Sequence, residues 1–207
     1  LGDFKTPDVD IFLNRVVELP LFILVGVVGG ILGGVFCKVW RLLQLFRQEF
    51  FADSRARTVW KLVEVAILSL LTSALLYFVP LMDGTCRAID AEDAVTFEAH
   101  RFDCPNGEIN EVAEIFFGSR EKTIRGILTD PTQFQTLTLF SVGFVFFPLM
   151  TLTLGVALPT GVFMPTFLIG TSLGGGAGII FQQWISPDIS PSTFALLGAA
   201  ALLAGVQ

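Results

Sequence analysis

Long stretches of this sequence contain no charged residue. Asp, Glu, Lys and Arg make up 15% of the 207 residues, whereas soluble domains average about 25%. None of these residues, and no histidine, falls between positions 131 and 187. A helix needs about 20 predominantly apolar residues to cross a bilayer core, and this uncharged run is far longer. Such a composition excludes an ordinary soluble domain and predicts an integral, multi-pass membrane protein.

The sequence also has few of the side chains that carry catalysis. His100, the only histidine, lies in a hydrophilic stretch, and the apolar runs are nearly free of ionisable residues. Ionisable residues inside a membrane usually mark proton or cation relays. The net charge of −6 lies almost wholly in loops. We therefore expect a protein that is not an enzyme, that needs no cofactor or metal, and that has no nucleic-acid partner.

The apolar segments and their breaks predict an all-α membrane domain of tilted and broken helices. The sequence begins without Met and ends within an apolar run, so we expect a fragment of a single transmembrane domain from a longer polytopic protein. Pro148 predicts a kink, and Ser192 is a plausible N-cap for the last helix. An acidic extramembrane loop is expected over 83–130. The expected helices are 19–50, 59–79, a short one at 108–117, 134–158, 161–184 and 192–206.

Loop charges predict the orientation of these helices. Six basic residues face two acids between positions 38 and 61, and nine acids face two arginines between 83 and 114. Basic loops remain in the cytoplasm of most membrane proteins. The first loop is therefore expected inside and the second outside or in a lumen, without indicating which membrane.

Two helices carry glycines four residues apart. Gly26, Gly30 and Gly34 form one such row, with Gly29 and Gly33 beside them, and a second row follows further along the chain at Gly170, Gly174 and Gly178. Small residues at this spacing let helix backbones approach closely in lipid. Both rows are expected to be helix-packing faces.

Cysteine usage fits an outer position of the acidic loop. Cys86 and Cys104 flank this loop, and an oxidising compartment would let them pair. A disulfide is the favoured interpretation. Free thiols and a metal ion held together with His100 are the alternatives.

The most informative break reads Gly-Val-Phe-Met-Pro at 161–165. Pro159 ends the preceding helix, and a proline is tolerated within the first turn of the next. The first amide groups of that helix lack intrahelical acceptors, and the helix dipole makes this end partly positive. An ordinary turn near the surface is the alternative. The candidate anion-binding residues are Gly161, Val162, Phe163, Met164 and Pro165.

The surrounding residues resemble one known family. The segment GVALPTGVFMP at 155–165, followed by LIGT at 168–171, resembles the CLC family of chloride channels and chloride/proton exchangers. The similarity continues in PSTFALLGAAALLAGV at 191–206 and in EKTIRGIL at 121–128. It covers nearly the whole sequence, is loosest over 83–104, and is closer to eukaryotic than to bacterial members.

The resemblance implies part of the second half of a CLC-like, inverted-repeat membrane domain. It implies chloride transport, with the amides of Val162 and Phe163 at a central chloride site and the Phe163 side chain along the pathway. It also implies voltage gating in some members, coupled protons in others, and a homodimer in the bilayer. The family's gating and proton-relay glutamates and its CBS domains have no counterpart in this sequence, so channel and exchanger are not distinguished. An unrelated secondary transporter that binds a substrate carboxylate at a broken helix is the alternative function.

Overall fold

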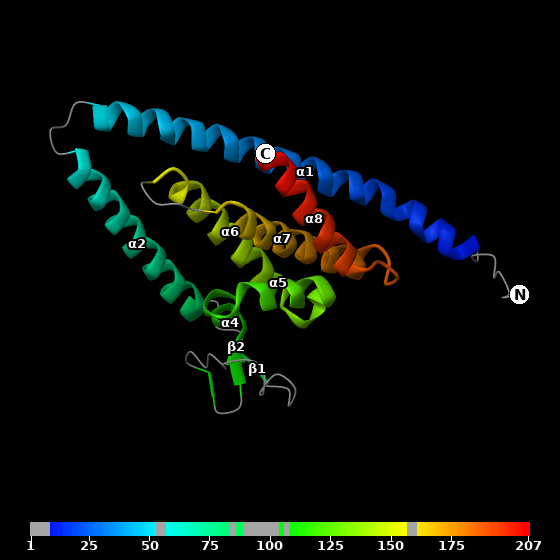
Figure 1. The fold of residues 1–207 in the computed structure, drawn as a ribbon. Helices are drawn as coiled ribbons and strands as arrows, with labels where there is room; N and C mark the ends of the chain where they lie inside the picture. The colour runs from blue at the N-terminus through cyan, green and yellow to red at the C-terminus, as the bar shows by residue number, and fades with distance from the viewer. Residues whose placement is uncertain (1–8, 53–56, 83–85, 89–103, 106–107, 157–160) are drawn as a thin grey trace, which may run out of the picture.

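The computed structural model describes residues 9–52, 57–82, 86–88, 104–105, 108–156 and 161–207. Within these ranges the regular secondary structure is helical except for one small antiparallel sheet (Figure 1). Two long helices, α1 (Val9–Ala52) and α2 (Arg57–Met82), lie along the outside of a group of shorter ones. Among the described residues, four helices are long and apolar enough to cross a membrane: α1, α2, α6 and α7.

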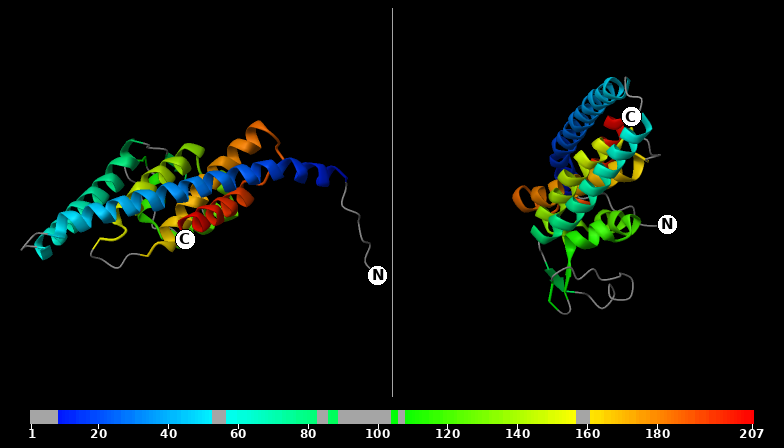
Figure 2. Two further views of the ribbon diagram at one scale, coloured as in Figure 1. Left: turned by 90° about the horizontal axis from the view of Figure 1, so that it is seen from above. Right: turned by 90° about the vertical axis from the view of Figure 1, so that its left-hand side faces the viewer.

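The remaining elements follow in chain order. Strand β1 (Cys86–Ala88) pairs antiparallel with β2 (Glu108–Asn110), which leads directly into the next helix. The later helices are α4 (Glu111–Phe117), α5 (Arg120–Thr129), the single 3₁₀ turn η1 (Pro131–Gln133), α6 (Thr136–Thr153), α7 (Phe163–Trp184) and α8 (Pro191–Val206). The views of Figure 2 show α8 beside the middle of α1.

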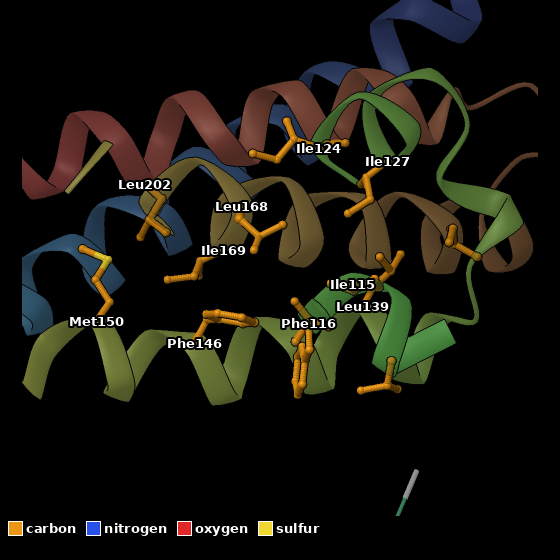
Figure 3. Packing of buried hydrophobic residues seen from close by; sticks show 14 of the residues in the cluster. Ile115, Phe116, Ile124, Ile127, Leu139, Phe146, Met150, Leu168, Ile169 and Leu202 are labelled. Atoms are coloured by element: carbon orange, nitrogen blue, oxygen red, sulfur yellow. The ribbon is translucent and has the colours of Figure 1, made fainter. Parts of the chain in front are cut away.

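Helix α7 lies at the centre of the core. In its most apolar window 61% of the residues are buried, against none in that of α2. Leu168 and Ile169 of α7 meet Phe146 of α6 and Leu202 of α8 (Figure 3). Because α7 contacts α5, α6 and α8, the position of this helix is fixed by its neighbours in the core.

The glycine row of α7 packs as its spacing predicts. A Cβ atom on Gly170 would collide with the backbone of Ala199 in α8, and one on Gly174 would collide with the Phe194 carbonyl. A Cβ on Gly178 would lie 2.8 Å from the Cα of Pro191. The missing side chains therefore let α7 and α8 pack backbone to backbone.

The glycine face expected on α1 packs against α8 through only one of its two rows. No described atom lies within 4 Å of a Cβ built on Gly26, Gly30 or Gly34. The close contacts are made instead by the adjacent Gly29, against Ala201, and Gly33, against Gly205. Two glycine rows run side by side on α1, and the sequence does not show which of them faces α8.

Several helix boundaries differ from those expected. Helix α1 begins at Val9, so Pro20 lies inside it. The last helix begins at Pro191 with Ser190 as its N-cap residue; Ser192 instead donates a hydrogen bond to the Thr129 carbonyl at 3.0 Å. Proline at the first helical position explains this start, since its missing N–H is not needed there.

The described part of the expected acidic loop contains regular structure that its composition does not indicate. It contains α5 and the β1–β2 sheet, neither of which was expected there, and α4 starts at Glu111 rather than 108. The Glu111 side chain is 4% exposed and accepts a hydrogen bond from the Gln135 N–H at 3.1 Å. A carboxylate at this position satisfies an otherwise unpaired amide at the start of α6.

Candidate functional site at the start of α7

The first turn of α7 presents free backbone amides. The helix begins at Phe163, and its N-cap residue Val162 makes no side-chain capping hydrogen bond. The first helical bond runs from the Thr166 N–H to the Val162 carbonyl at 3.1 Å. Pro165, at the third helical position, has no N–H. The geometry therefore leaves the amides of Val162, Phe163 and Met164 without intrahelical acceptors.

The sequence segment that contains this end of the helix carries no acid. The first turn of α7 contains no Asp or Glu, and the whole of 131–187 is uncharged. The dipole of such a helix corresponds to about half a positive charge at its start. The site can therefore attract an anion without a fixed cation beside it.

The side chains around these amides are open to the surroundings. Phe163 and Met164 are 57% and 49% exposed, whereas Thr166 one turn later is fully buried. The Phe163 ring stacks on that of Phe167, with centroids 5.8 Å apart. The first turn thus emerges from the core and carries an exposed aromatic ring next to the free amides.

The candidate residue Gly161 shows no backbone feature that requires glycine. Gly161 has no left-handed φ, and a Cβ built on it would meet no described atom within 4 Å. The left-handed glycine is Gly155, with φ 86°. It follows the end of α6 at Thr153, so this helix stops five residues before the expected position 158. A left-handed glycine is a common helix terminator; Pro159 and Thr160 lie outside the described residues.

The turn after α6 is attached to α1 and α2 by polar side chains. Arg47 of α1 donates to the carbonyls of Leu152 and Leu154 at 2.7 and 2.8 Å, and its Nε pairs with Glu64 of α2 at 2.5 Å. Gln44 donates to the Leu154 carbonyl at 3.4 Å. In the sequence, Arg47 is one of the six basic residues between positions 38 and 61 that predict a cytoplasmic loop. The missed signal was an arginine and a glutamate placed near the ends of two long apolar helices.

The two cysteines that flank the expected acidic loop are joined. Cys86 and Cys104 form a disulfide, with their Cα atoms 5.8 Å apart. Cys37 is a free, exposed thiol in α1. His100 lies outside the described residues, and the described part of the chain holds no group of three potential metal ligands.

Comparison with known proteins decides the family. The family model described as voltage gated chloride channel matches residues 7–207. The chain belongs to this family. Membership rules out the unrelated secondary transporter considered from the sequence, and it agrees with the apolar helices of a multi-pass membrane protein.

Relatives from distant organisms are similar to this chain to about the same degree. The human H(+)/Cl(-) exchange transporter 7 is 31% identical over 192 residues, which cover 91% of this chain and 23% of that protein. Chloride channel protein CLC-d of Arabidopsis thaliana is 29% identical over 202 residues, covering 91% and 25%. The chain thus spans about a quarter of the length of these relatives.

A solved structure supports the fold. The crystal structure of a eukaryotic CLC transporter matches with a TM-score of 0.58 and 24% identity, covering 90% of this chain and 26% of that one. The CLC-like, all-α membrane fold and the eukaryotic character expected from the sequence are confirmed.

Proposed function

We propose that the protein containing this chain transports chloride across a membrane, and that the first turn of α7 forms part of its central anion site. The observation that carries the proposal is the uncapped start of α7, whose amides at Val162, Phe163 and Met164 open into uncharged surroundings. Family membership supports chloride as the anion.

Backbone amides suit an ion that must bind and leave again. A negative charge at the N-terminal end of a helix is stabilised by about 0.3–1 kcal/mol, and by up to ~2 kcal/mol where it is partly buried. A lysine or arginine in the site would hold the anion more strongly and slow its release, whereas conduction needs binding that is favourable but weak. In this proposal the Phe163 ring borders the pathway beside these amides.

One helix start supplies only some of the ligands that a desolvated chloride needs. The remaining donors, the gate and any proton relay belong to the part of the protein outside this chain. The relatives include both a protein named as a proton/chloride exchanger and proteins named as chloride channels. We propose chloride transport in either form, in a homodimer within the bilayer, with voltage gating as a further expectation for the channel form.

Flux measurements on the intact protein in liposomes test this proposal. An outward chloride gradient should drive chloride efflux that empty liposomes lack. Uphill proton movement in response to that gradient identifies an exchanger, and chloride flux without it identifies a channel. Absence of chloride flux from correctly folded protein, with gates opened by voltage, would contradict the proposed function in both forms.

A further inference from the structure

We infer that Arg47 is a positioning residue for the start of α7, because it fixes the end of α6, which precedes the anion site in the sequence. The inference rests on the proposed function of that site. It assigns a transport role to a side chain that touches neither the free amides nor the Phe163 ring. The contact that carries it joins the Arg47 guanidinium to the end of α6.

Arg47 satisfies the final carbonyls of α6. The last carbonyls of a helix have no intrahelical partner, and the two that Arg47 reaches, at Leu152 and Leu154, lie on either side of the helix end. An arginine there is favoured by the negative end of the helix dipole. Its planar fork can hold two carbonyls and a carboxylate together, whereas the lysine ammonium is a compact point charge.

Glu64 fixes the direction of the fork. The Glu64 carboxylate binds Arg47 Nε, which leaves both terminal nitrogens to face α6. The two side chains are only 12% and 23% exposed, so water screens the pair less than it would on a free surface. Helices α1, α2 and α6 are therefore joined at one point through a single guanidinium.

The turn has little freedom once it is attached. Gly155 packs against the Gln44 side chain so closely that a Cβ atom there would collide with it. Gln44 also donates to the Leu154 carbonyl, as Arg47 does. A shift of the turn would break these bonds, and the turn is connected to Val162 by a short length of chain. In this inference the start of α7 is held by the packing of its helix in the core and, along the chain, by the end of α6 that Arg47 fixes.

The first test is hydrogen–deuterium exchange in the intact, reconstituted protein carrying Arg47→Lys. Lysine keeps the charge but cannot reproduce the fork, so charge-assisted bonds to the turn are lost. Amide exchange in a peptide covering 151–163 should accelerate by about tenfold or more, since each such bond contributes about 1.5–3 kcal/mol. Peptides from α8 should be unchanged. Arg41→Lys, at an exposed position of the same helix, is the matched control.

The second test is anion preference, measured as the ratio of chloride to nitrate flux per protein. A purely structural loss would lower the amount of active protein but leave this ratio unchanged. Arg47→Lys should shift the ratio by about 2- to 30-fold, the range reported for residues that affect a site without contacting its ligand. Arg41→Lys should leave the ratio as it is in the unmodified protein.

A charge reversal distinguishes the donation of Arg47 to the carbonyls at the end of α6 from its ion pair with Glu64. The double variant Arg47→Glu with Glu64→Arg restores opposite charges on α1 and α2, but a carboxylate at position 47 cannot donate to the Leu152 and Leu154 carbonyls. We expect no recovery of either readout. Full recovery, or an unchanged flux ratio in Arg47→Lys while the unmodified protein transports chloride, would overturn the inference and leave the proposed function intact. Absence of chloride flux in the unmodified protein would overturn both.

Discussion

Gly33 of α1 and Gly205 of α8 face each other backbone to backbone: a Cβ atom on Gly205 would lie 3.1 Å from the Gly33 Cα. A Cβ on Gly33 would collide with the Gly205 backbone itself. Since α8 packs on α7 along most of its length, this contact also holds α1 against the central helix. The position of α7 therefore depends on glycines in three helices.

Substitution of Gly33 should destabilise the protein. Gly33→Ala forces α1 away from α8, and overpacking of this kind costs about 1–3 kcal/mol. Thermal unfolding in detergent, followed by size-exclusion chromatography, measures the effect. Gly34→Ala is the matched control, because its Cβ would enter open space and alanine favours the helix by up to about 1 kcal/mol. Equal effects of the two substitutions would contradict the packing described here.

Loss of the disulfide should loosen the extramembrane sheet without stopping transport. Cys86 lies in β1 and is bonded to Cys104, 18 residues along the chain. Opening a loop of this size typically costs about 3 kcal/mol. Cys86→Ser should therefore speed amide exchange in β1 and β2 while chloride flux per protein remains unchanged. Cys37→Ser, which removes the free thiol, should change neither measurement.

Removal of the Phe163 ring should alter anion flux. Phe163→Ala leaves the backbone amides in place but removes the side chain proposed to border the pathway, so larger anions should pass more easily relative to chloride. A change of tenfold in this ratio would correspond to about 1.4 kcal/mol. Phe144→Ala is the control, because Phe144 of α6 is 68% exposed and lies away from the free amides. Unchanged flux and selectivity in well-folded Phe163→Ala protein would count against the proposed wall.

Sequence patterns predicted the helical membrane fold because the bilayer requires long apolar helices whichever helices lie beside them. The α7 row at Gly170, Gly174 and Gly178 was also predictable, since close helix contact in lipid favours small residues. On α1, the same reasoning identified the glycine face but not which of its two rows contacts α8. Gly29 and Gly33 have the same spacing as Gly26, Gly30 and Gly34, and only the location of α8 distinguishes them.

The residues of the candidate site could be predicted from the sequence, but the side chains that hold the end of α6 could not. A helix start after a Pro/Gly break is a local feature, and Val162 to Pro165 can be identified without knowledge of the fold. Arg47 and Glu64 reach the end of α6 from two other helices, so no local pattern shows their contact. Gly155 is a residue that commonly ends a helix and could have predicted the end of α6. The expected end at 158 was instead based on the later Pro159.

A carboxylate beside the free amides should compete with chloride. Gly161 immediately precedes the N-cap residue and has open space around it, so Gly161→Asp should be accommodated without disturbing the core. Its negative charge would occupy the positive end of α7. Chloride affinity, measured by calorimetry on the intact protein, should fall while thermal stability is unchanged or higher. Gly161→Asn supplies a side chain of the same size without the charge and should bind chloride more strongly than the aspartate variant. Equal chloride affinity in the two variants would mean that the amides at the start of α7 do not contact the ion.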